Sequence, residues 1–177
     1  PGRPYLLETV VRTLGVGHEM TQGTADSNEL WLDVTVTSGD RIIGRSGALD
    51  SRRDVDPWAY YLNAYLLDRE GNRIERRNAQ DIFVTLYNHQ IPPGAAAVVH
   101  YALTIPADVT DSITVETRLQ YRKFDTRFLN HIEGDSFNGN ELPITTLAMD
   151  RVSIPVGDRA GVTAQIPSIP EWERWND

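Results

Sequence analysis

A rigid corner between two strand-like runs, within residues 78–101, is the feature that most constrains the fold of this chain. Pro92 and Pro93 fix two backbone φ angles and remove two hydrogen-bond donors, and Gly94 can adopt the positive φ that ends such a turn. The runs on either side are rich in β-branched and aromatic residues. The sequence therefore predicts that two strands reverse here in a hairpin-like corner.

Alternation of apolar and polar residues with period two continues along most of the chain. It is clearest over 112–122, where it predicts that Ile113 and Val115 point inward and that Gln120 and Arg122 point outward. Apolar residues on both faces of 58–68 favour a central strand covered on both sides, with a short helix as the alternative. The expected strands are 5–14, 29–37, 41–44, 58–68, 81–88, 97–105, 112–122 and 143–156.

No stretch sustains the 3.6-residue period of a helix, so the sequence predicts an all-β fold with negligible helix. Many short strands separated by turn signals favour an antiparallel β-sandwich, immunoglobulin-like or Greek-key, over residues 1–156. We expect an extended tail over 157–177 that docks on a partner through Trp172 and Trp175. The expected core residues are Leu32, Val34, Leu66, Phe83, Leu86, Val99, Tyr101, Leu103, Ile113, Val115, Leu119 and Tyr121.

Composition excludes several classes of function. The formal net charge of −8 over 177 residues leaves no basic surplus to neutralise nucleic-acid phosphates or an anionic membrane surface. Because the chain has no cysteine, it has no disulfide, no thiolate zinc site and no CxxCH motif for covalent haem. No catalytic motif is present either, and we expect a protein without enzymatic activity.

The chain has no apolar run of about 20 residues that would span a bilayer. Its first residues lack the order of a signal peptide and do not begin with Met. We therefore expect a mature product or a piece of a larger protein.

Two polar clusters are candidate metal sites. Asp50, Asp54 and Asp56 have oxygens that Ca²⁺ accepts, but Arg52 and Arg53 lie between them, and a solvated loop with aspartate turns is favoured. His89 and His100 lie on opposite sides of the Pro-Pro-Gly corner with no obvious third ligand, and His131 lies in a segment that reads as a loop. Exposed, hydrogen-bonded rings are favoured for the pair at the corner.

His18 differs from the other histidines because it lies in a glycine-rich loop between two strands, where an imidazole can project away from the sandwich. A neutral imidazole is a common axial ligand of haem iron, and Met20 is a weaker candidate for the same role. In a ligating His18 the other ring nitrogen would donate to a nearby acceptor, with Glu19 or Asp26 as candidates. A structural or merely solvated histidine is the alternative.

Several segments resemble a β-rich region of large secreted multihaem c-type cytochromes. They are 17–32, 42–50, 56–74, 78–101 (NAQDIFVTLYNHQIPPGAAAVVHY), 119–128 and 142–156. In those proteins the region follows a haem-binding part with CxxCH motifs, and residues 170–177 resemble the point where tetratricopeptide-like helices begin. Residues 17–23 (GHEMTQG) are similar to a GHxFPTG motif whose histidine is a candidate distal haem ligand, although Met20 and Thr21 replace its Phe-Pro pair.

The resemblance implies a non-enzymatic accessory module or subunit of a periplasmic or extracellular electron-transfer assembly. Its partner would be a c-type cytochrome or another subunit of that complex, which would also contribute any haem c. One alternative is a purely structural β-sandwich subunit that scaffolds a larger complex. Another is a carbohydrate-binding module, which a coplanar strip of exposed aromatic rings would favour. Sequence leaves these three open.

Overall fold

The computed structural model describes residues 1–23 and 25–157, and this part of the chain contains eight strands and one α-helix. The strands are β1 (Arg3–Arg12), β2 (Glu29–Ser38), β3 (Arg41–Ser46), β4 (Ala64–Leu67), β5 (Val84–Asn88), β6 (Ala96–Ile105), β7 (Ser112–Arg122) and β8 (Ile144–Pro155). The helix α1 covers Thr126–Glu133, and short 3₁₀ turns cover Ala79–Asp81 and Gly134–Ser136.

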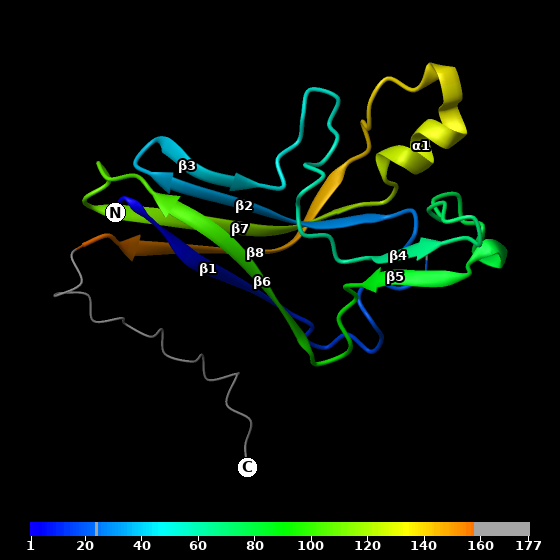
Figure 1. Cartoon of the computed structure of the whole chain (residues 1–177), viewed down its shortest axis with the longest axis horizontal. Coiled ribbons are helices and arrows are strands. Elements are labelled where there is room, and N and C mark those ends of the chain that lie inside the picture. Colours follow the sequence, from blue (N-terminus) through cyan, green and yellow to red (C-terminus); the bar gives the residue numbers. More distant parts are fainter. Residues whose placement is uncertain (24, 158–177) are drawn as a thin grey trace, which may run out of the picture.

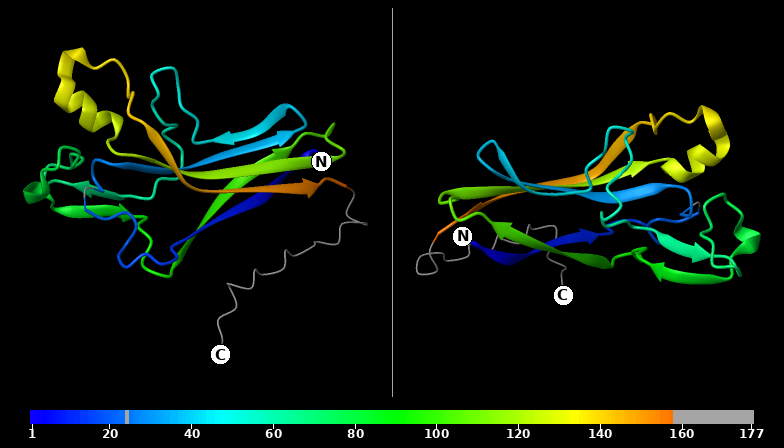
Figure 2. Two further views of the ribbon diagram at one scale, coloured as in Figure 1. Left: turned by 180° about the vertical axis from the view of Figure 1, so that it is seen from behind. Right: turned by 45° about the horizontal axis from the view of Figure 1, so that its top comes forward.

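The strands form three antiparallel sheets. Four strands are ordered β3-β2-β7-β8, while β1 pairs with β6 and β4 pairs with β5. Figure 1 shows the β1–β6 ribbon crossing the four-stranded sheet, and the tilted view in Figure 2 separates the two as layers. The chain leaves the larger sheet after β3 and returns to it at β7, so its two central strands, β2 and β7, are not consecutive in the sequence. The predicted all-β, antiparallel fold is confirmed.

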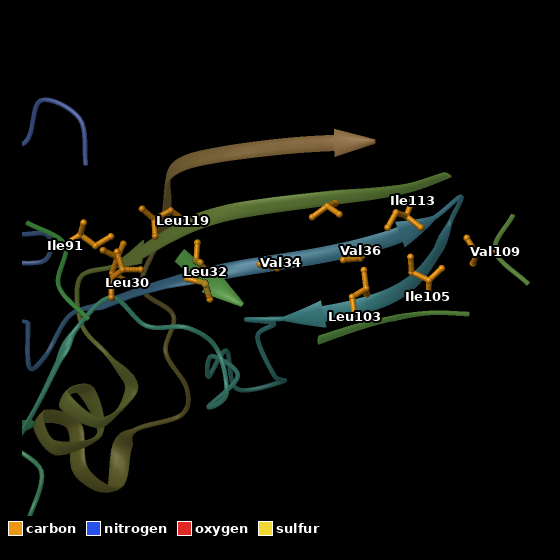
Figure 3. Close-up of a cluster of buried hydrophobic side chains, with 13 residues drawn as sticks. Leu30, Leu32, Val34, Val36, Ile91, Leu103, Ile105, Val109, Ile113 and Leu119 are labelled. Atoms are coloured by element: carbon orange, nitrogen blue, oxygen red, sulfur yellow. The ribbon is translucent and has the colours of Figure 1, made fainter. Parts of the chain in front are cut away.

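The main core lies between the two layers. Alternate side chains of β2, from Leu30 to Val36, lie beside those of the neighbouring strand β7 and form one cluster with side chains of β6 from the other layer (Figure 3). This is the arrangement that period-two alternation produces when one face of a strand is covered. The buried members are Leu30, Leu32, Val34, Val36, Leu62, Ile91, Val99, Leu103, Ile105, Val109, Ile113, Val115 and Leu119.

The Pro-Pro-Gly corner turns the chain, but it does not join a hairpin. Gly94 has a φ of 71°, as the turn requires. The strand before it, β5, pairs with β4, and the strand after it, β6, pairs with β1. The predicted hairpin-like reversal is therefore wrong, because the corner carries the chain from one sheet into another.

Segment 58–68 is not a central strand. Only four of its residues form β4, and these four are half-buried. Leu62, two residues before β4, is fully buried, and its N–H donates to the carbonyl oxygen of Leu30 at 2.9 Å. Phe83, just before the partner strand β5, and Leu86 within β5 are also exposed, so they are not core residues as predicted. A two-stranded sheet buries little, which explains both errors.

The outer face of the larger sheet is covered at one end, and the prediction that Gln120 and Arg122 point to solvent is wrong. Both side chains are buried, and so is Trp31 on the same face. Trp31 forms a second small core with Val55 and Ala59 of the segment after β3. Alternation identified the two faces of β7 correctly, but a loop from elsewhere in the chain covers the polar one.

Helix α1 is the one short α-helix of the described residues, and it places His131 on its last turn instead of in the expected loop. Asp125 caps its first turn by accepting a hydrogen bond from the backbone N–H of Phe128 at 2.7 Å. Gly134 ends it with a φ of 55°. In the sequence, these two cap residues are the features that indicate the helix, because eight residues are too few for a sustained periodic pattern.

The predicted docking tail, 157–177, lies almost entirely outside the described residues. Trp172 and Trp175 belong to that part, so their role stays a prediction. Val156, immediately after β8, packs against the main core. Among the described residues, the contacts of the main core therefore extend as far as Val156.

Candidate functional site

The loop that carries His18 is anchored on both sides to the Pro-Pro-Gly corner. Before the histidine, the N–H of Thr13 donates to Ala95 O at 3.0 Å, and its hydroxyl donates to Pro92 O at 2.6 Å. After it, Met20 and Ile91 exchange two backbone hydrogen bonds, of 2.9 and 2.6 Å. These bonds hold both ends of a short, glycine-containing loop against one rigid turn.

His18 is exposed in this loop. Its Nδ1 lies 2.8 Å from the backbone carbonyl oxygen of Glu19, which is an acceptor, so the bond requires the proton on Nδ1. Nε2 is then the ring nitrogen with a free lone pair. No described residue pairs with it. Asp26, the other predicted acceptor, instead accepts a bond from the N–H of Arg77 at 2.9 Å.

Met20 is placed differently from His18. Its side chain is half-buried against the main core, and its backbone is paired with Ile91. A thioether in that position contributes packing between the loop and the corner. Of the two candidate ligands, His18 is therefore the accessible one.

The remaining histidines have other roles. The ring of His89 stacks on Tyr60, with centroids 5.0 Å apart, and contacts Tyr87 at 4.6 Å. It is half-buried and not on an open sheet face as expected. His100 is exposed on β6 and lies 2.9 Å from Glu8 of the paired strand. In residues 1–23 and 25–157 no cluster of three or more histidine or acidic side chains is arranged to hold a metal ion.

The aspartate-rich segment after β3 shows the turn chemistry favoured from sequence. Asp50 Oδ1 accepts the backbone N–H groups of Arg52 at 2.8 Å and Asp54 at 2.9 Å. Asp56 accepts those of Trp58 at 2.9 Å and Gly47 at 3.2 Å. The carboxylates thus fix the shape of a loop.

An apolar groove of about 510 Å³ runs between β1 and β8. Among the described strands, β1 pairs only with β6 and β8 only with β7, so both borders are open sheet edges. Val10 and Met149 line the groove and are 61% and 60% exposed. Exposed apolar side chains beside open strand edges are typical of docking surfaces.

A buried ion pair lies where β2 begins, at Glu29. Arg122 is fully buried and donates two hydrogen bonds to Glu29 Oε2, from Nε at 2.8 Å and Nη2 at 2.5 Å. Its Nη1 donates to the carbonyl oxygens of Arg53 at 2.8 Å and Asn140 at 3.2 Å. Burial raises the pKa of Glu29 to about 7, against the opposing effect of Arg122. The sequence pattern did not predict this pair, because period-two alternation assigns Arg122 to the polar, outward face of β7.

Among the described residues no helix is both long and apolar enough to cross a membrane. No protein-family model matches the chain. No curated protein matches it in sequence.

One solved structure is similar to this chain, a penta-heme cytochrome c552 from Thermochromatium tepidum. The TM-score is 0.58 and the sequence identity is 17%. The match covers 87% of this chain but only 37% of the cytochrome, so the chain spans little more than a third of that protein. At this identity the likeness establishes a shared fold.

Proposed function

We propose that this chain is a non-enzymatic module of a periplasmic or extracellular electron-transfer assembly. It associates with a multihaem c-type cytochrome, as a neighbouring chain or a neighbouring segment, and His18 supplies an axial ligand to one haem. The similar fold in a penta-heme cytochrome supports the type of partner. The resemblance of residues 17–32 and 78–101 to such proteins supports it independently.

The observation that carries this proposal is the state of the His18 imidazole. Nδ1 is bonded to the carbonyl oxygen of Glu19 at 2.8 Å, and Nε2 has no hydrogen-bond partner among the described residues. A histidine that ligates iron commonly donates its second ring N–H in this way, which fixes the tautomer and raises the basicity of the ligating nitrogen. The anchored loop also holds the ring before any partner arrives, which lowers the ordering cost of binding.

The donor set of the loop fits an axial ligand and not covalent attachment. The chain contains no cysteine, so a c-type haem would be held by the partner chain or segment. When bound, the haem supplies one-electron chemistry. The contribution of this chain would be a neutral nitrogen donor at His18 Nε2 and the second bond that orients it.

Substitution of His18 in the assembled complex tests the proposal. The chain is purified with its cytochrome partner, and His18→Ala is compared with His131→Ala, which removes an exposed histidine of α1. We expect His18→Ala to convert one low-spin haem to a high-spin form in optical and electron paramagnetic resonance spectra. The His131 variant should match the wild type. Unchanged spectra and midpoint potentials in His18→Ala would refute ligation.

A purely structural role is the second candidate, and the β1–β8 groove favours it. An open apolar groove indicates that a protein surface covers this side of the sandwich, and a scaffold needs no ligand to haem. If the His18 variant still co-purifies with the cytochrome and its spectra are unchanged, the chain is a scaffold. If no cytochrome co-purifies with the wild type, both candidates fail.

A carbohydrate-binding module has less support. In the described residues the exposed tryptophan, tyrosine and phenylalanine side chains are Trp58 and Phe83. They belong to different segments, and neither forms a ring pair with another aromatic side chain. The flat strip of rings that a sugar chain would stack on is absent from residues 1–23 and 25–157.

A further inference from the structure

A second cavity, of about 370 Å³, lies away from the His18 loop. Its walls come from the start of β2, the segment that leads into β4, strand β5 and the first turn of α1, which gather at one end of the molecule (Figure 1). Its volume falls in the range of small-molecule sites, about 300–1,000 Å³.

Two asparagines in the wall each have a buried oxygen without a partner. Asn28 and Asn63 line the cavity and are 8% and 7% exposed. The Oδ1 atom of each is buried without a hydrogen bond. Neither side-chain amide bonds to any other residue in the part of the chain that the structure describes. A buried acceptor without a donor costs about 1–3 kcal/mol, so two at one cavity indicate that something with donors occupies it.

The charges of the wall favour a positive occupant. The charged lining residues are Glu29, Asp54, Asp125, Arg73 and Arg127, three acidic and two basic. Both arginines are already engaged, Arg73 with Asp125 at 3.5 Å and Arg127 with Glu75 at 3.2 Å. Glu29 uses Oε2 for both bonds from the buried Arg122, which leaves Oε1 without a bond from that guanidinium.

Aromatic rings complete the wall. Tyr65 and Tyr87 form a tilted ring pair with centroids 5.3 Å apart, and Tyr61 lines the same cavity. The guanidinium of Arg73 already lies over the Tyr65 ring, 4.8 Å from its centroid. The cavity therefore combines carboxylates, free amide oxygens and tyrosine faces, each of which attracts a cation with N–H donors.

We propose that this cavity binds a small organic cation through a primary ammonium group. An ammonium has three donors and no acceptor, which matches a site whose unpaired buried atoms are both acceptors. An anion would meet a wall in which acidic side chains outnumber basic ones and both arginines are already paired. This inference is independent of the haem proposal, because it involves neither the His18 loop nor the β1–β8 groove.

Calorimetric titration of the whole chain with butane-1,4-diamine tests the proposal. Butane-1,4-diol is the matched neutral probe, with the same chain length and hydroxyl groups in place of the ammonium groups. We expect one diamine to bind per chain and to raise the thermal midpoint, and we expect the diol to have no effect. Absence of diamine binding at millimolar concentration, or equal binding of the diol, would overturn the proposal.

Variants locate the binding site. Asn63→Leu and Asn28→Leu keep the approximate size of the side chain and remove its oxygen, and each should weaken diamine binding at least tenfold. Because neither oxygen is paired in the free protein, the thermal midpoint without diamine should stay the same or rise. Asn130→Ala, on the exposed part of α1, is the control and should bind as the wild type does. Wild-type affinity in both leucine variants would overturn the assignment of the site.

Discussion

Arg122 and Glu29 form an ion pair across β2 and β7 in which one carboxylate oxygen accepts both guanidinium bonds, and the arginine side chain has no exposed surface. The guanidinium also lies 5.8 Å from the ring centroid of Trp31. Both charges are removed from water, so each needs the other. Either one alone would be a buried charge with no opposite charge to offset its desolvation cost. The pair thus couples the two central strands to the loop that covers them.

Breaking this pair is expected to destabilise the fold strongly. At a pH above about 7, where Glu29 is ionised, Arg122→Met leaves this carboxylate buried without its partner and should lower the free energy of unfolding by about 3–5 kcal/mol, measured by urea denaturation. The double variant Glu29→Leu with Arg122→Met removes both charges and should recover most of that loss. A double variant no more stable than Arg122→Met would contradict this account.

The pKa of Glu29 predicts a pH dependence with a definite sign. Burial raises this pKa from 4.5 to about 7, so between these values the unfolded chain ionises while the folded one keeps its proton. Unfolding then releases a proton, and stability should fall as pH rises, by up to about 1.4 kcal/mol per unit. Burial also raises the pKa of Asp125, which acts in the same direction.

Urea unfolding at pH 5 and pH 7 measures this slope, with the double variant of Glu29 and Arg122 as the control. The pKa values of Asp68 and Asp108 are lowered by their hydrogen bonds, so these exposed groups stabilise the fold above the ordinary aspartate range. This contribution of Asp68 and Asp108 to stability is lost only as pH falls through their lowered pKa values, below the range between pH 5 and pH 7 that the experiment covers. Equal slopes in the wild type and the control would exclude Glu29 as the cause.

Sequence alternation predicted which strands form but not which strands meet. The patterns of β2 and β7 identified their buried faces because one face of each is covered by the other layer. Nothing local distinguished β4 from β6 as the neighbour of β5, since pairing is decided by contacts between segments far apart in the chain. The Pro-Pro-Gly corner determines that the chain turns after β5. Contacts with distant segments determine which sheet the next strand joins.

The candidate site was predictable to the same limited extent. Glycines around His18 indicated an exposed loop, and the structure places the ring there with Glu19 as its acceptor. The burial of Arg122 was not predictable, because alternation distinguishes two faces and carries no information on what covers the polar one. The unpaired oxygens of Asn28 and Asn63 likewise come to one cavity only when the separate segments that form its wall meet in the fold.

A close backbone approach at Gly47 predicts a severe effect of a single methyl group. Gly47 has a φ of 78°, and a Cβ atom there would lie 2.2 Å from the carbonyl oxygen of Leu32. Gly47→Ala should therefore cost about 3 kcal/mol or more in denaturant unfolding. Gly71→Ala is the control, with a φ of 84° and open space around its Cβ, and should cost about 1–2 kcal/mol from backbone strain alone. Similar losses in both variants would contradict a steric cause.

Removal of the predicted docking tail should leave the described fold intact. Described core contacts end at Val156, so a chain truncated after Gly157 retains all of them. We expect it to keep the far-ultraviolet circular dichroism spectrum of the full chain and its urea midpoint, and to associate more weakly with the cytochrome partner. The comparison variant is Trp172→Ala with Trp175→Ala in the full chain, which should weaken association by a similar factor. Unfolding of the truncated chain would show that the tail belongs to the core.

A charge in the β1–β8 groove should weaken association with the partner without unfolding the chain. Met149 is 60% exposed and lines the groove, so Met149→Glu places a carboxylate where an apolar surface is expected to dock. Burial of that charge on binding should raise the dissociation constant at least about tenfold, or about 1.4 kcal/mol. Leu86→Glu, on the exposed face of β5, is the control, since Leu86 is exposed to a similar degree and lies outside the groove. If both variants bind the cytochrome equally well, the groove is not the docking surface, and the axial-ligand role of His18 would have to rest on another contact.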